Sequence, residues 1–168
     1  MIEKGKISQE PFLEILKTLE QAESANLVDW NAMNIASVDQ TNQPSSRMVL
    51  LKKISDDGLV FYTNYNSRKG KEIELNPKVA VNFWWRELKK QIRVEGFIEK
   101  ASEEDSDDYF YSRPLKSRVS AIISNQSSKI SSYEDLTNQI DNYLEQNDES
   151  SIKRPDHCGL YIVIPNAV

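Results

Sequence analysis

Three short segments of this chain, residues 47–52, 61–64 and 67–69, combine cationic and hydroxyl side chains that could bind a phosphate group. Each lies within or directly after a hydrophobic run, so a strand or a helix start would hold these side chains rigidly, as an anion site requires. Charge-assisted hydrogen bonds contribute roughly 1.5–3 kcal/mol each, so three or four converging donors give tight binding. The candidate donors are Arg47, Ser67, Arg68 and Lys69.

Ser67 precedes residues 68–75, which the sequence predicts as a short helix that ends at Asn76-Pro77. With Ser67 as the N-cap, backbone amides and the positive end of the helix dipole would add to an anion site. The same spacing is also typical of a solvated helix face that carries three cations. The spacing alone leaves both interpretations open.

Arg47 and Lys52 lie five residues apart in one predicted strand, so they would face opposite sides of an uninterrupted sheet. One pocket holds both only if the strand bends, and otherwise one of the two cations points to solvent. Gln91 stands among apolar residues of another strand, where its amide could donate to and accept from the edge of a ring. An outward-facing strand residue is the alternative interpretation for Gln91.

Tyr109, Arg113 and Ser117 recur at intervals of four residues. If one helix continued through this stretch, the three side chains would share a face. Pro114 is expected to kink the chain there. The end of an ordinary amphipathic helix is the alternative interpretation.

The overall charge argues against a general nucleic-acid binder. The 168 residues carry 21 Lys+Arg against 26 Asp+Glu, a formal net charge of −5. Cations nevertheless gather near residues 47–53, 68–71 and 113–118. This pattern fits small anionic ligands better than a polyanion.

Cys158 is the only cysteine, which rules out an internal disulfide bond. No apolar run approaches the roughly 20 residues that span a membrane, and residues 1–6 lack the apolar stretch of a signal peptide. We therefore expect a cytoplasmic protein without a membrane partner. His157 adjoins Cys158 without further potential ligands nearby, so we expect no metal site.

The length fits a single domain spanning residues 1–168. An apolar stripe at helical spacing predicts an N-terminal helix over residues 8–24, capped by Ser8. Residues 32–101 hold short β-branched and aromatic runs separated by turn residues, which predict successive antiparallel strands. The predicted strands are residues 33–38, 48–54, 59–63, 79–85 and 91–99.

Capping patterns at Ser102 and Ser132 predict helices within a segment over residues 102–147. A closing strand over residues 157–165 follows. Consecutive short strands with helices set apart from them indicate a mainly β fold with flanking helices (α+β). An antiparallel barrel is therefore expected rather than a doubly wound parallel sheet.

The order and spacing of these segments resemble the pyridoxamine 5'-phosphate oxidase family, from about Met33 to Ile164. The resemblance implies a split β-barrel that binds FMN at the interface of a homodimer. It also implies FMN-dependent oxidation of pyridoxamine or pyridoxine 5'-phosphate to pyridoxal 5'-phosphate, with hydride transfer to the flavin and oxygen as acceptor. The implied FMN contacts are Arg47, Met48, Val49, Leu50, Tyr62, Thr63, Ser67, Arg68, Lys69, Gln91, Gln126 and Ser127. The implied substrate contacts are Lys52, Tyr109, Arg113 and Ser117.

Family members continue beyond the strand matched by residues 159–163. Their next segment carries a tryptophan and an arginine that contact FMN, and an Arg-x-His pair that meets the substrate. The present sequence ends at Val168 without counterparts of these residues, so we expect impaired activity. Two other functions stay open, a non-catalytic FMN or pyridoxal-phosphate binding protein and a split-barrel flavin reductase. The sequence assigns no catalytic residue and leaves the preference between amine and alcohol open.

Overall fold

The computed structural model describes residues 2–168, which divide into two compact units. One unit holds the described residues up to Tyr62, together with Glu72–Lys100 and Tyr161–Val168. It contains most of a β-sheet and is called the barrel unit. The other unit holds Thr63–Lys71 and Ala101–Leu160. It contains most of the helices and is called the helical unit.

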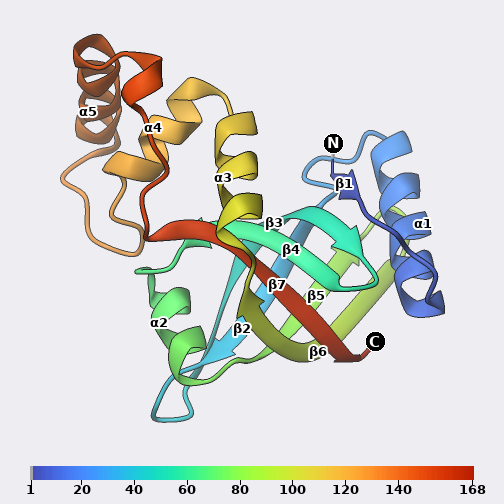
Figure 1. The fold of residues 1–168 in the computed structure, drawn as a ribbon. Coiled ribbons are helices and arrows are strands. Elements are labelled where there is room, and N and C mark those ends of the chain that lie inside the picture. The colour runs from blue at the N-terminus through green and yellow to red at the C-terminus, as the bar shows by residue number, and fades with distance from the viewer. Residues whose placement is uncertain (1) are drawn as a thin grey trace. The chain divides into compact units, whose positions relative to one another are not determined.

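Seven strands form one sheet in the order β1-β3-β2-β5-β6-β7-β4, and a further pairing of β3 with β4 closes it into a barrel (Figure 1). The pairings of β2 with β3 and β5, of β3 with β4, and of β6 with β5 and β7 are antiparallel. The predicted antiparallel barrel with flanking helices is therefore confirmed. The strands are β1 (Glu3–Lys4), β2 (Ala32–Val38), β3 (Pro44–Ser55), β4 (Gly58–Asn64), β5 (Lys78–Trp85), β6 (Lys90–Lys100) and β7 (Cys158–Ala167).

Alternation of side chains gives each strand a buried face and a more exposed face. In β2, Met33 and Ser37 are fully buried, whereas the residues next to them are partly exposed. Trp84 and Trp85, neighbours in β5, point to opposite faces as expected. Trp84 is 58% exposed, whereas Trp85 is buried and its indole N–H donates to the carbonyl oxygen of Trp30 at 2.8 Å. The sheet thus has a packed interior and an outer face that carries an exposed aromatic ring.

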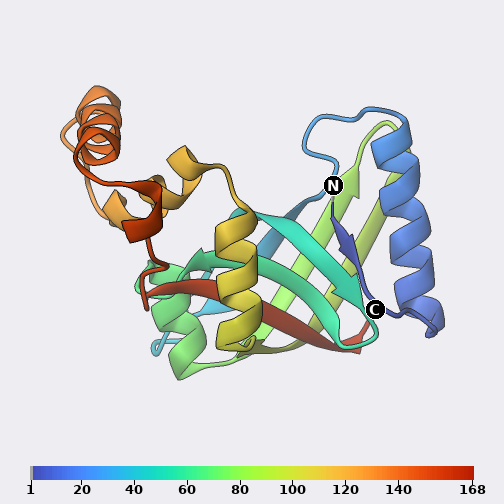
Figure 2. The ribbon, with the colours of Figure 1, turned by 45° about the horizontal axis from the view of Figure 1, so that its top comes forward.

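Helix α1 (Glu10–Ser24) lies beside the sheet of the barrel unit (Figure 2). Lys90, at the start of β6, donates to Thr18 Oγ1 at 3.2 Å and to Gln21 Oε1 at 3.1 Å. These hydrogen bonds, together with the burial of an apolar stripe, hold α1 in its place beside the sheet. The buried residues of α1 are Phe12, Ile15, Thr18, Leu19 and Ala22.

The start of α1 differs from the prediction. Gln9 rather than Ser8 occupies the N-cap, and it makes no side-chain capping bond. The hydroxyl of Ser8 instead donates to Asp56 Oδ2 at 2.6 Å, and its backbone N–H donates to the same carboxylate. These hydrogen bonds hold the pKa of Asp56 below its usual value. Ser8 therefore anchors the chain before the helix instead of capping it.

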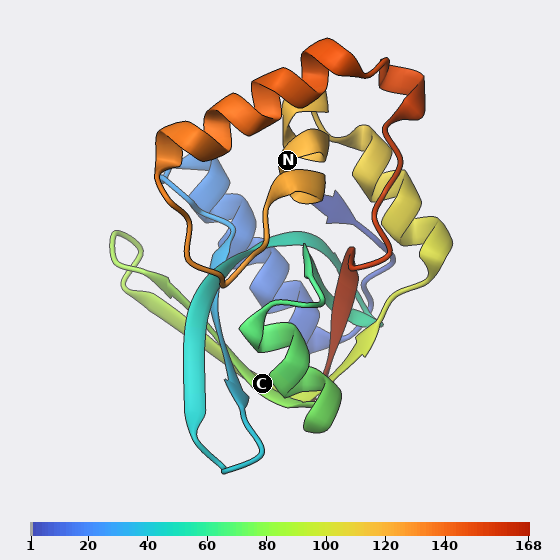
Figure 3. The ribbon, with the colours of Figure 1, turned by 90° about the vertical axis from the view of Figure 1, so that its left-hand side faces the viewer.

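The helical unit contains α3 (Glu103–Ser112), α4 (Leu115–Ile123), α5 (Tyr133–Gln146) and the short 3-10 helix η1 (Glu149–Ser151). The predicted N-caps of α3 and α5 are confirmed, because Ser102 and Ser132 accept hydrogen bonds from backbone N–H groups three residues later, each at 3.0 Å. Figure 3 shows α5 beside α4. The Lys116–Asp141 ion pair joins these two helices at 2.7 Å.

Arg154 ties the segment before β7 to α3. Its guanidinium donates to Asp107 at 2.6 Å, to Glu103, and to the carbonyl oxygen of Cys158 at 2.6 Å. Burial lowers the pKa of Arg154, but the hydrogen bonds that it donates to the carboxylates of Asp107 and Glu103 outweigh burial, so its pKa is raised overall. Arg154 thus remains a cation in the packing of this unit.

No helix within residues 2–168 is long and apolar enough to cross a membrane. Over the same described range, no three His, Cys, Asp or Glu side chains gather in a way that could hold a metal ion.

Candidate functional site

Lys69 is the centre of a buried polar cluster in the helical unit, which we call the Lys69 cluster. Its Nζ donates to Thr63 Oγ1 and Gln126 Oε1, each at 2.7 Å, and to Ser67 Oγ at 3.1 Å. Thr63 Oγ1 also donates to Gln126 Oε1 at 3.2 Å. Lys69 is only 6% exposed. The structure therefore brings four predicted FMN contacts together around one cation, although three separate segments supply them.

Helix α2 (Arg68–Leu75) begins directly after Ser67, as predicted. Ser67 Oγ accepts from the backbone N–H of Gly70 at 3.4 Å and donates to the carbonyl oxygen of Asn64 at 2.7 Å. A Cβ at Gly70 would overlap the carbonyl oxygen of Tyr65, so only glycine fits in this first turn. This close approach fixes the helix start and, with it, the backbone that carries Lys69.

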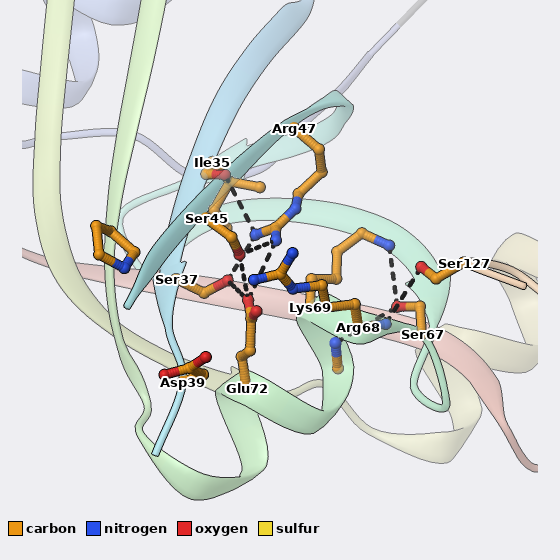
Figure 4. Close-up of polar contacts among 12 residues, drawn as sticks. Ile35, Ser37, Asp39, Ser45, Arg47, Ser67, Arg68, Lys69, Glu72 and Ser127 are labelled. Carbon is orange, nitrogen blue, oxygen red and sulfur yellow. Dashed lines mark hydrogen bonds and ion pairs between the residues drawn. The ribbon is translucent and has the colours of Figure 1, made fainter. Parts of the chain in front are cut away.

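A turn over residues 125–128 brings Ser127 to the same helix start. The backbone N–H of Ser128 donates to the carbonyl oxygen of Asn125 at 3.1 Å. Ser127 itself adopts a left-handed φ of 70°, which is uncommon for residues other than glycine and is often found at functional sites. Its hydroxyl accepts from the backbone N–H of Arg68 at 3.2 Å (Figure 4). Arg68 and Ser127 are both exposed, so this edge of the Lys69 cluster is open to a ligand.

Arg47 lies in a different polar cluster, in the barrel unit, which we call the Arg47 cluster. Its guanidinium donates to Ser37 Oγ at 2.5 Å, to Ser45 Oγ and to Glu72 Oε2 at 3.1 Å (Figure 4). Both hydroxyls donate in turn to Glu72 Oε2, at 2.5 and 2.6 Å. The Glu72 side chain is 5% exposed. Arg47 thus faces a buried carboxylate and two hydroxyls whose protons point toward that carboxylate.

The other predicted contacts in β3 divide between its two faces. Met48 and Leu50 are 60% and 41% exposed, whereas Arg47 and Val49 share the less exposed face. The pairing with β4 shifts its register between Leu51 and Lys53, which leaves Lys52 at a β-bulge. A bulge bends the strand and interrupts alternation, so the expectation of opposite faces for Arg47 and Lys52 does not apply. Lys52 is half-buried.

Tyr62 and Gln91 complete the predicted FMN contacts. Tyr62 is half-buried in β4, next to Thr63. Gln91 lies on the exposed face of β6, where its Nε2 donates to Asn82 Oδ1 at 2.7 Å. Its amide is therefore oriented by a neighbouring strand and accessible from outside the barrel unit.

Tyr109, Arg113 and Ser117 lie on either side of a helix break in the helical unit. Tyr109 is in the last turns of α3, Arg113 is the C-cap of that helix, and Ser117 is in the first turn of α4. Arg113 is extended, with φ −79° and ψ 149°, and Pro114 precedes α4. The expected interruption at Pro114 is therefore present. All three side chains are half-buried, which suits groups that meet a ligand.

Three residues of the Arg47 cluster, Ser37, Ser45 and Glu72, were not predicted from the sequence. Ser37 continues the alternation of buried residues in β2, so its place on the inner face was foreseeable from period-two spacing. Glu72 follows Lys69 by three residues in α2 but carried no pattern that distinguished it from a solvated helix residue. The pairing of these groups depends on contacts between distant segments.

The Lys69 cluster contains the kinds of group that bind a phosphate monoester, and its N–H and hydroxyl donors are directed to one another and to nearby acceptors, so a phosphate would have to replace some of these bonds. A cation, hydroxyl groups and a helix start in one place are the groups that recognise such an anion. The buried position of Lys69 strengthens its electrostatic interactions, because water screens them less.

The pyridoxamine 5'-phosphate oxidase family model matches residues 19–143. The chain belongs to this family. Curated relatives agree with that assignment. The pyridoxine/pyridoxamine 5'-phosphate oxidase of Nostoc sp. is 47% identical over 163 residues, which are 97% of this chain and 76% of that protein. Pyridoxine/pyridoxamine 5'-phosphate oxidase 2 of Hydrogenovibrio crunogenus is 41% identical over 99% of this chain and 78% of its own length.

Solved structures share the family fold. PhzG from Burkholderia lata 383, in complex with tetrahydrophenazine-1-carboxylic acid, is 25% identical with a TM-score of 0.86. The match covers 94% of this chain and 77% of PhzG. An FMN-binding protein from Nostoc punctiforme, 19% identical, matches with a TM-score of 0.74 over 95% of this chain and 83% of its own. Membership of this family supports FMN as the cofactor.

Proposed function

We propose that this protein oxidises pyridoxamine 5'-phosphate or pyridoxine 5'-phosphate to pyridoxal 5'-phosphate. The observation that carries the proposal is the Lys69 cluster, a buried cation with hydroxyl and amide partners at the start of α2. Relatives with 41–47% identity are named for this activity. When bound, FMN would supply the electron acceptor for the oxidation.

The FMN phosphate would be held by Lys69, by the hydroxyls of Thr63 and Ser67, and by the edge formed by Arg68 and Ser127. Each of these residues lies within the helical unit and is tied to another of them by a hydrogen bond. Side chains that are already held in place by these bonds reduce the entropy cost of ordering on binding. Arg47, Met48, Val49, Leu50, Tyr62, Gln91 and Gln126 are the further proposed contacts of the cofactor.

The substrate phosphate would be bound by Lys52, Tyr109, Arg113 and Ser117. Arg113 offers a planar guanidinium that can bind a phosphate through two parallel hydrogen bonds. Ser117 adds a hydroxyl from the first turn of α4. These groups would orient the substrate. Correct orientation by itself can account for a large share of the lowering of the activation free energy.

We further propose a homodimer. Met48 and Leu50 of β3 and Trp84 of β5 are 60%, 41% and 58% exposed on the outer face of the sheet. β2 lies between these two strands and pairs with both. Exposed apolar groups on neighbouring strands are typical of a protein interface. Light scattering of the parent protein should give twice the mass of one chain. The variant Trp84→Glu should shift the protein toward the monomer. A monomeric mass for the parent protein would contradict the proposal.

The activity is tested by anaerobic mixing of the FMN-loaded protein with pyridoxamine 5'-phosphate while the visible flavin absorbance is followed. Bleaching by the phosphorylated amine, and much weaker bleaching by pyridoxamine itself, is the expected result. Absence of bleaching with FMN bound would favour a non-catalytic binding protein. Bleaching by NADH alone would favour a flavin reductase.

A further inference from the structure

Arg118 occupies a position behind the helix break that carries Arg113 and Ser117. It is buried in the first turns of α4, and its side chain is 9% exposed. Its Nε donates to the carbonyl oxygen of Arg113 at 3.1 Å, and its terminal nitrogen donates to Glu149 Oε1. Arg118 therefore connects the break to η1 within the helical unit.

The carbonyl group of Arg113 needs such a donor. Arg113 ends α3 in an extended conformation, and the last carbonyl groups of a helix have no partner within that helix. Pro114 follows directly and has no N–H to donate. The backbone N–H groups of Ser117 and Arg118 donate to the carbonyl oxygen of Pro114 instead, at 2.8 and 3.1 Å. The guanidinium of Arg118 thus provides a hydrogen bond that the helices themselves do not supply.

The bond from Arg118 to Arg113 closes a short ring of backbone that contains Arg113 and Ser117. Closing that ring restrains the rotation of the Arg113 peptide and fixes where both side chains leave the backbone. Glu149 holds the other end of the guanidinium and balances its charge. The guanidinium of Arg118 thus donates to acceptors within the protein. Arg113 and Ser117 are half-buried, so their side chains can contact a ligand.

We propose that Arg118 is a positioning residue for the phosphate end of the substrate, acting through the backbone of Arg113. This inference rests on the proposed function, in which Arg113 and Ser117 bind the substrate phosphate. It predicts that loss of the Arg118 guanidinium weakens binding of phosphorylated vitamers without impairing the FMN site. A misplacement of about 1 Å in a positioning group can cost on the order of 100-fold in the efficiency of an enzyme.

The test compares Arg118→Ala with the parent protein in three measurements. We expect the KM for pyridoxamine 5'-phosphate to rise roughly tenfold or more, with kcat changed by less than about twofold. The affinity for pyridoxal 5'-phosphate in equilibrium dialysis should fall by a similar factor, whereas FMN affinity stays at the parent value. Arg118→Lys, which keeps the charge but loses the fork of donors, should fall between the parent and Arg118→Ala.

Arg154→Ala is the matched control. Arg154 is also a buried arginine of the helical unit that bonds carboxylates and a carbonyl oxygen, but it does not contact Arg113. We expect Arg154→Ala to lower thermal stability without raising KM selectively. An equal rise of KM in both variants would show general loosening of the unit and overturn the inference, as would an unchanged KM in Arg118→Ala.

The outcomes also separate this inference from the proposed function. If the parent protein binds the phosphorylated vitamer no better than pyridoxamine, the proposed function fails and the inference falls with it. If the parent prefers the phosphorylated vitamer and Arg118→Ala retains the full preference, only the inference fails. Should Arg118→Ala not fold, Arg118→Lys and Arg118→Gln decide the same question through their KM values and dialysis affinities.

Discussion

Arg47 and Lys69 are both cations within polar clusters, but their partners differ. Arg47 faces the buried carboxylate of Glu72, with two serine hydroxyls between them. Lys69 donates to three neutral oxygens. The Glu72 carboxylate balances the charge of Arg47 inside the protein, whereas the hydroxyl and amide oxygens around Lys69 hold its ammonium group in place. From this comparison we expect mainly a structural role for the Arg47 cluster and mainly a binding role for the Lys69 cluster.

The hydrogen-bond donors of both cations are engaged by the protein, because the three N–H groups of Lys69 donate to Thr63, Ser67 and Gln126. A guanidinium has five N–H groups. Both terminal nitrogens of Arg47 are engaged by the protein, one by Ser37 and the carbonyl oxygen of Ile35, the other by Ser45 and Glu72. Arg47 can therefore offer an incoming phosphate few donors unless these bonds exchange. Because the buried carboxylate of Glu72 also balances the charge of Arg47, we expect the contribution of Arg47 to FMN binding to be smaller than that of Lys69.

The largest expected effect is on stability, from Glu72→Ala. The variant leaves Arg47 without its carboxylate and two hydroxyls without their acceptor, and breaking a buried ion pair costs about 3–5 kcal/mol. Since the Arg47 side chain is 22% exposed, the lower end of that range is expected. Thermal or urea unfolding measures the loss. Glu74→Ala, at an exposed position of the same helix, is the control, and equal stability of the two variants would contradict a structural role for the Arg47 cluster.

The next effect is on cofactor binding, from Lys69→Met. Loss of one charge-assisted hydrogen bond, worth roughly 1.5–3 kcal/mol, should weaken FMN binding by roughly 10- to 150-fold. Quenching of FMN fluorescence during titration gives the Kd. Lys71→Met removes an exposed cation from the same helix and should change the Kd little. If Glu72→Ala weakened FMN binding more than Lys69→Met in folded protein, the contrast between the two clusters would be reversed.

A smaller effect on both properties is expected from Ser67→Ala. Ser67 accepts from Lys69 and from the backbone N–H of Gly70, so the variant removes both an N-cap and an orienting partner. Loss of an N-cap costs about 1 kcal/mol. Unfolding measures that loss, and an FMN titration should show a weakening below that of Lys69→Met. No change in either measurement would mean that the helix start does not organise the Lys69 cluster.

The smallest effect extends the comparison to a half-buried residue, Asp56. Hydrogen bonds from Ser8 lower its pKa in the folded state. A lowered pKa stabilises the fold at pH values above the unfolded pKa of about 4, and this contribution is lost as the pH falls through the folded pKa. The Tm difference between the parent and Asp56→Asn should be small at pH 7 and vanish in stronger acid. A Tm difference between the two proteins that grew on acidification would contradict a lowered pKa of Asp56 in the folded state.

The sequence predicted the barrel and the helix start that holds Ser67 and Lys69 because both follow from local patterns, whereas Thr63 and Gln126 were implied only by the family resemblance. Alternating apolar runs gave the strands, and Ser67 before a short helix gave the position of Lys69. Ser37, Ser45 and Glu72 were not found, since their meeting depends on how β2, β3 and α2 pack. A bend of the strand between Arg47 and Lys52 was left open, and the sequence could not decide it because a register shift depends on the partner strand. The role of Arg118 could not be predicted from the sequence either. Its acceptor is the backbone carbonyl oxygen of Arg113, and that bond depends on the break between α3 and α4.

The strand order of the barrel has a consequence for how the protein is made. β7 is the last of the strands along the chain, yet it lies between β6 and β4 in the sheet. Until β7 leaves the ribosome, the facing edges of β4 and β6 have no strand to pair with, and unpaired edges invite association between nascent chains. Closure is therefore a late, long-range event with the slow kinetics of non-local pairing. We expect chains interrupted before residue 158 to depend on chaperones, whereas the completed chain hides these edges within its own sheet.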